Sequence, residues 1–83
     1  MNDLTDLQNI GKELEKQLIN VGITTPDQLQ KVGSRGAWLR IKIFDPSACY
    51  MRLCALEGAI QGVRWHNLPD KTKAELKTFY KQH

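Results

Sequence analysis

Apolar residues recur three or four positions apart along almost the whole chain, and no stretch shows the apolar–polar alternation of a half-buried strand. Spacing of this kind places apolar side chains on one face of an α-helix. The sequence therefore predicts an all-α fold, a compact bundle of about five short helices.

Glycine and proline divide this helical pattern into segments. Apolar stripes between the breaks predict helical segments at Leu4–Leu7 and over about residues 11–21, 26–32, 34–43, 48–63 and 69 to the end. Each break has a physical reason. Gly22 adopts the backbone conformation that ends a helix, and Pro26 loses no hydrogen bond at a first helical position. Pro46 disfavours helical geometry in the residue before it.

The segment over residues 48–63 has the most regular apolar spacing, in a stripe formed by Cys49, Leu53, Leu56, Ile60 and Val63. A neighbouring face carries small residues, among them Gly58. Glycine inside a helix costs about 1 kcal/mol relative to alanine. We therefore expect another helix to pack closely against Gly58.

Chain length and charge restrict the function classes. With 83 residues, 41% of them hydrophobic, we expect one domain over residues 1–83 with a thin core, which favours a binding module over a self-contained enzyme site. Residues 1–33 carry three Lys against five Asp and Glu, whereas residues 34–83 carry nine Lys and Arg against four Asp and Glu. Any face that attracts anions is therefore expected in the later part of the chain.

Neither a membrane nor a cofactor is expected. The segment Met1–Asp6 is acidic and polar, unlike a secretory signal, and the most apolar region is too short and too charged to span a bilayer, so we expect a cytoplasmic protein. Cys49 and Cys54 would point to different faces of one helix, which favours two buried free thiols over a disulfide or a shared metal. The chain has no zinc-binding spacing and no glycine-rich nucleotide loop.

Arg64, Trp65 and His66 form an aromatic and basic cluster where the 48–63 segment ends, and they are a candidate partner surface. Alternatively, Trp65 packs between the last two helices with its indole N–H bonded to a carbonyl. His66 has no nucleophile or second acid–base group near it in sequence, so we predict no catalytic residue.

Glu57 and Trp38 leave alternatives open. Glu57 has apolar neighbours, and we expect it to pair with a cation such as Arg40 or Arg64, or to lie at the solvent edge. Trp38 either joins Arg35 and Arg40 in an interaction surface or completes the core, and spacing does not separate these two placements.

One turn pattern occurs twice, as Leu7-Gln8-Asn9-Ile10-Gly11 and, 22 residues later, as Leu29-Gln30-Lys31-Val32-Gly33. Each copy resembles a helix-hairpin-helix unit, whose turn amides and following helix N-terminus hold a nucleic-acid phosphate. That family usually has glycine where this chain has Asn9 and Lys31. The second copy is the better candidate for binding phosphate or DNA, through Lys31, Gly33, Ser34 and Arg35. The alternative is that both turns are only compact helix joints.

Three separated blocks extend the comparison over nearly the whole chain: Leu7–Lys12, Val21–Ile23 and Leu56–Pro69. In this order they resemble the C-terminal domain of the TfoX/Sxy family. The resemblance implies a small helical fold of helix-hairpin-helix or SAM-domain-like type. It also implies a role in regulating bacterial natural transformation and DNA-uptake genes, commonly alongside the cyclic-AMP receptor protein.

These observations favour a non-enzymatic regulatory interaction module that acts in transcriptional or competence regulation through a protein partner, namely a transcription regulator. The alternative is direct, sequence-independent DNA binding through the second turn. The sequence leaves the oligomeric state open.

Overall fold

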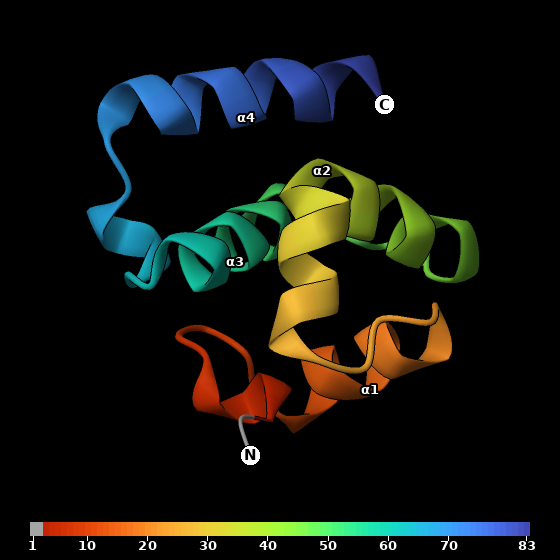
Figure 1. The fold of residues 1–83 in the computed structure, drawn as a ribbon. Coiled ribbons are helices and arrows are strands. Elements are labelled where there is room, and N and C mark those ends of the chain that lie inside the picture. Colours follow the sequence, from red (N-terminus) through yellow and green to blue (C-terminus); the bar gives the residue numbers. More distant parts are fainter. Residues whose placement is uncertain (1–2) are drawn as a thin grey trace.

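The computed structural model describes residues 3–83, and these residues form helices and connecting loops without a strand (Figure 1). The four α-helices are α1 (Lys12–Asn20), α2 (Pro26–Phe44), α3 (Tyr50–Gln61) and α4 (Asp70–Gln82). Two single 3₁₀ turns, η1 (Leu4–Asp6) and η2 (Trp65–Asn67), precede α1 and α4. The predicted all-α class is confirmed. The predicted number of about five helices is corrected to four α-helices, because the segments on either side of Gly33 form one kinked helix and the first short segment is only a 3₁₀ turn.

The kink in α2 depends on Gly33, whose φ of 83° and ψ of 163° lie outside the helical region and favour glycine. The first part of α2 rises from the level of α1, and the second part then runs beside α3 (Figure 1). The predicted start of this helix is confirmed, because the Thr25 side chain accepts a hydrogen bond from the Gln28 N–H at 3.2 Å. Pro26 occupies the first helical turn.

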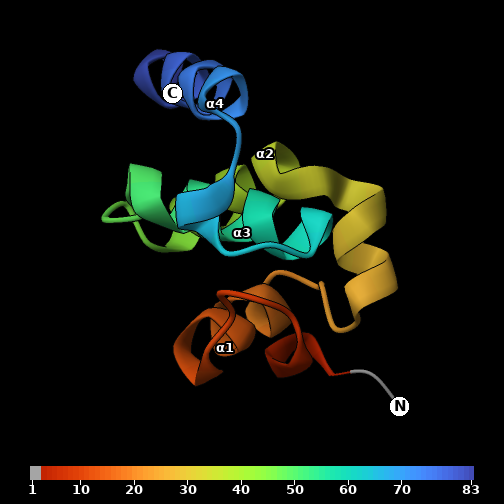
Figure 2. The same ribbon diagram turned by 90° about the vertical axis from the view of Figure 1, so that its left-hand side faces the viewer.

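Helix α3 is the centre of the fold and packs most extensively against α2. Figures 1 and 2 both show α4 on one side of the α2–α3 pair and α1 on the opposite side. Residues on several faces of α3 are therefore buried: Leu53, Cys54, Leu56, Gly58 and Ala59. The apolar stripe predicted for residues 48–63 describes only part of the buried surface of α3, because other elements cover this central helix on more than one side. At the ends of that stripe, Cys49 is exposed, and Ile60 and Val63 are half-buried.

Trp38 lies in the core and joins α2 to its neighbours. Of its two predicted placements, the interaction surface and the core, the structure shows the core. Its side chain is fully buried, and its indole N–H donates to the Cys49 carbonyl at 3.2 Å. The Phe79 and Tyr80 rings of α4 meet its face edge-on, with centroids 6.0 and 5.7 Å away. The Tyr50 hydroxyl also donates to the Lys73 carbonyl at 2.9 Å, which fixes α4 to α3.

Asp45 holds the connection between α2 and α3. Its carboxylate accepts hydrogen bonds from the Ser47 hydroxyl, from Arg52 Nη1 at 2.9 Å and from Gln17 Nε2 of α1 at 3.0 Å. The hydrogen bond from Ser47, followed by that from Arg52, lowers the pKa of Asp45 to about 2. Three elements are thus tied together at the break that Pro46 introduces.

Asn9, in the first of the two repeated turns, has a positive φ of 70° and packs directly over Gly58. Its Nδ2 donates to the Val63 carbonyl at 2.9 Å and to the Ala55 carbonyl at 3.4 Å, and its Oδ1 accepts from the Trp65 N–H at 3.1 Å. A Cβ atom on Gly58 would lie 2.5 Å from Asn9 Nδ2 and 2.7 Å from the Val63 oxygen. We predicted that another helix packs against Gly58 and offsets the cost of a glycine inside a helix. The structure places a turn and a loop there instead.

We predict that Gly58→Ala destabilises the protein although alanine favours a helix. The new methyl group must displace the Asn9 amide, and overpacking of this kind costs about 1–3 kcal/mol, against a gain of about 1 kcal/mol in helix propensity. Urea denaturation should show a net loss of up to about 2 kcal/mol in the free energy of unfolding.

Gly36→Ala is the matched control, because its new Cβ would meet only the end of the Val32 side chain, at 3.0 Å. We expect it to leave the free energy of unfolding unchanged or to raise it by up to about 1 kcal/mol, because alanine gains helix propensity there without displacing a hydrogen-bonded group. Equal effects of the two substitutions, or a gain in stability for Gly58→Ala, would contradict the close packing of Asn9 on Gly58.

Candidate functional site

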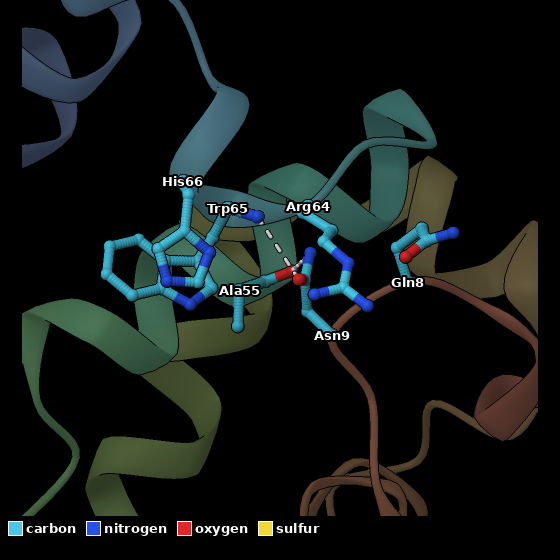
Figure 3. A pocket seen from close by; sticks show the side chains of 6 residues that line it. All are labelled: Gln8, Asn9, Ala55, Arg64, Trp65 and His66. Carbon is cyan, nitrogen blue, oxygen red and sulfur yellow. Dashed lines mark hydrogen bonds between the residues drawn. The ribbon is translucent and has the colours of Figure 1, made fainter.

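A pocket of about 330 Å³ opens where the first repeated turn meets the end of α3 and the start of η2 (Figure 3). It is lined by Gln8, Asn9, Ala55, Arg64, Trp65 and His66. The three residues of the predicted partner surface therefore line one pocket. Gln8 and Asn9 complete it from the other end of the sequence, and the sequence pattern did not identify them as site residues.

The shape of this pocket follows from the way α3 ends. Gly62 adopts the left-handed conformation with φ 76°, which stops the helix. Arg64 is extended, with φ −66° and ψ 144°, and Trp65 and His66 then form the η2 turn. The two rings of that turn stack, with centroids 3.9 Å apart and planes inclined by 29°.

Burial differs along the predicted partner surface. Trp65 is half-buried and packs against the core, whereas Arg64 and His66 are exposed. The expected hydrogen bond from the Trp65 indole to a carbonyl is not formed within residues 3–83. In Figure 3 the Arg64 guanidinium lies near Gln8 and Asn9, and the stacked rings lie on the opposite side of Asn9.

The polar atoms of the pocket are mostly hydrogen-bond donors. The Asn9 amide is fully engaged by Ala55, Val63 and Trp65. In the part of the chain that the structure describes, the side chains of Gln8 and Arg64 make no hydrogen bond. No Asp or Glu lines the pocket.

The candidate phosphate-binding residues lie elsewhere, around the kink of α2. Lys31 and Arg35 are exposed on either side of Gly33, and the Arg35 guanidinium is 5.8 Å from the centroid of the Phe79 ring. Ser34 is buried and donates its hydroxyl to Glu57 Oε1 at 2.6 Å. The kink therefore presents two cations to solvent, while the Ser34 side chain is engaged inside the protein.

Glu57 accepts hydrogen bonds from neutral groups and not from the cations expected for it. Besides the Ser34 hydroxyl, its partner is Gln61 Nε2 at 2.6 Å on the other carboxylate oxygen. Within residues 3–83 the ion pair is formed instead by Arg52 and Asp45, 2.9 Å apart. The predicted pairing of Glu57 with Arg40 or Arg64 is therefore wrong, because Glu57 faces the kink of α2.

Apolar side chains are exposed at the far end of α2. Ile43 is 77% exposed and Phe44 is 74% exposed. The helix ends at Phe44, so no following turn covers the ring. A smaller pocket of about 160 Å³ lies beside it, between the ends of α1 and α2.

The cysteines are free, and the expectation that both are buried holds only for Cys54. Burial raises the pKa of the Cys54 thiol, whereas Cys49 precedes α3 and is exposed. Among residues 3–83, no three His, Cys, Asp or Glu side chains gather as metal ligands would. None of the described helices is long and apolar enough to cross a membrane.

Comparison with known proteins places this fold among close structural relatives. An uncharacterized protein from Listeria monocytogenes, crystallised in a triclinic form, is 52% identical, with a TM-score of 0.96 over 98% of this chain and 92% of that chain. A protein of unknown function from Listeria monocytogenes, in a tetragonal form, is 53% identical, with a TM-score of 0.93 over 95% of this chain and 96% of that chain. No curated protein matches the chain.

The match to a family is equally extensive. Residues 1–80 match the family of the TfoX C-terminal domain. This confirms the resemblance found in the blocks Leu7–Lys12, Val21–Ile23 and Leu56–Pro69. The chain belongs to the TfoX C-terminal domain family.

Proposed function

We propose that this protein is a non-enzymatic regulatory module of the cytoplasm that binds a protein partner, a transcription regulator, in the control of competence and DNA uptake. Membership of the TfoX C-terminal domain family supports the regulatory part of the proposal. The observation that carries the binding part is the pocket in which Arg64, Trp65 and His66 come together.

The pocket has the composition of a protein-binding site. Tryptophan and arginine are enriched among the residues that dominate binding energy at interfaces. Trp65 is held in place by the core and by its stacking on His66, so a partner would order few side chains on binding. Arg64 adds an exposed cation beside these rings.

Catalysis has little support in this pocket. His66 supplies an imidazole, and the other lining residues include no nucleophile and no second acid–base group. Binding therefore accounts for the pocket better than a reaction does.

A complementation experiment tests this function in the organism that carries the gene. We expect deletion of the gene to lower the transformation frequency and the transcript levels of DNA-uptake genes. The wild-type protein should restore both, whereas Arg64→Glu at equal abundance should not, because it reverses the charge at the pocket.

Lys77→Glu is the matched control, since Lys77 is exposed on α4 and does not line the pocket. It should restore both measurements as the wild-type protein does. Unchanged transformation and transcript levels in the deletion strain, or full restoration by Arg64→Glu, would contradict the proposed function.

Direct DNA binding at the α2 kink is the second candidate. Lys31 and Arg35 favour it, because both are exposed on either side of Gly33. The inward hydrogen bond of Ser34 limits the site to these two cations and the backbone. Any binding would then rest on few phosphate contacts and fall with ionic strength.

A titration of labelled duplex DNA at two salt concentrations tests this candidate. Direct contact predicts a log–log slope of about 0.9 per neutralised phosphate. The combined substitution Lys31→Glu and Arg35→Glu should remove most of the affinity, while Lys77→Glu should retain more of it. Absence of binding at low salt, or unchanged affinity in the double variant, would eliminate direct DNA binding at the kink.

A further inference from the structure

The hydrogen-bonding groups of the pocket formed by Gln8, Asn9 and the Arg64–His66 segment favour one kind of ligand. Its free side-chain hydrogen-bonding capacity is dominated by the Arg64 guanidinium, which presents five N–H donors and no acceptor. The Trp65 indole adds a group that only donates. A ligand that brings acceptors therefore matches most of these free groups.

The carbonyl groups next to the pocket are already engaged, whereas the Gln8 side-chain oxygen makes no hydrogen bond within residues 3–83. The Ala55 and Val63 carbonyls accept from Asn9 Nδ2, and Asn9 Oδ1 accepts from the Trp65 N–H. The His66 carbonyl accepts from Lys73 Nζ at 2.8 Å. A cationic ligand would find few free acceptors here, and it would meet the positive charge of Arg64.

Two cations, Arg64 and Lys73, lie on either side of the stacked rings in the sequence. Arg64 lines the pocket directly, and Lys73 reaches from α4 to the His66 backbone. No Asp or Glu lines the pocket to offset them. The local charge therefore attracts an anion, and the guanidinium suits a planar, two-oxygen group.

We propose that this pocket binds a carboxylate side chain in an acidic segment of the protein partner, an inference that rests on the proposed function. A volume of about 330 Å³ admits one or two side chains. A nucleic-acid backbone is favoured less, because it is bound by cations that follow successive phosphates, and here a single arginine lines the pocket.

Titration of the ¹⁵N-labelled protein with the peptide acetyl-Glu-Glu-Glu-Glu-amide, followed by NMR, tests this inference. The peptide should shift the Trp65 indole, Arg64 and His66 signals, with the binding weakening as salt is added. Arg64→Gln should weaken binding about tenfold, as loss of one charge-assisted contact predicts. Lys77→Gln, a matched change outside the pocket, should leave the affinity within about twofold.

Several outcomes would overturn the carboxylate assignment. These are equal binding of the neutral peptide acetyl-Gln-Gln-Gln-Gln-amide, shifts centred on Lys31 and Arg35, or unchanged affinity in Arg64→Gln. A duplex DNA that shifts the same pocket signals and displaces the peptide would assign the pocket to phosphate instead. The Arg64→Gln spectrum must match the wild type away from the pocket, and His66→Ala provides a second variant if it does not.

The peptide titration tests the carboxylate site and the complementation experiment tests the proposed function, and the two can give independent results. If no peptide binds but Arg64→Glu still fails to restore transformation, the partner function stands and the acidic ligand is wrong. If the peptide binds at the pocket and Arg64→Glu restores transformation fully, the carboxylate site stands and the proposed function is wrong.

Discussion

The contact of Asn9 with Gly58 is the constraint on which much of this structure depends. One amide group reaches across the C-terminal half of α3 and the loop that follows, with hydrogen bonds to Val63, Ala55 and Trp65. Two conditions make this possible. Asn9 adopts a positive φ, which asparagine tolerates better than most residues, and Gly58 has no side chain where the amide lies.

The position of the pocket and of the last helix follows from this contact. Because Val63 and Trp65 are bonded to Asn9, the chain leaves α3 in one direction, and Trp65 and His66 stack beside the first turn. The buried Leu68 and the aromatic contacts of Trp38 with α4 then complete the far side of the molecule. Sequence-distant segments thereby combine into one pocket, which Arg64 lines.

Local rules explain most of the elements, while the site depends on contacts that local rules do not describe. Pro26 and Pro46 were sufficient to locate the start and end of α2, and Gly33 located a break that is a kink and not a turn between two helices, because backbone restrictions act within a few residues. The residue types of Arg64, Trp65 and His66, and their position after the 48–63 segment, were enough to predict that they form one cluster, and they line one pocket. The roles of Asn9 and Glu57 were not, because their partners lie 46–56 and 23 residues away, respectively, apart from the local contact of Glu57 with Gln61. Asparagine in place of a hairpin glycine was the available indication of a positive φ at position 9.

The most direct test of this account is urea denaturation of Asn9→Gly, with NMR spectra recorded for the same variant. Glycine keeps the positive φ without strain and removes only the side chain, so the change isolates the amide contacts. The account predicts a loss of about 2 kcal/mol in the free energy of unfolding, at about 1 kcal/mol for each well-formed hydrogen bond, and displaced signals from Val63 to His66. Asn20→Gly, at the exposed end of α1, should cost less than about 1 kcal/mol. Equal stability of Asn9→Gly and the wild type, with unchanged signals from Val63 to His66, would contradict the central role of Asn9.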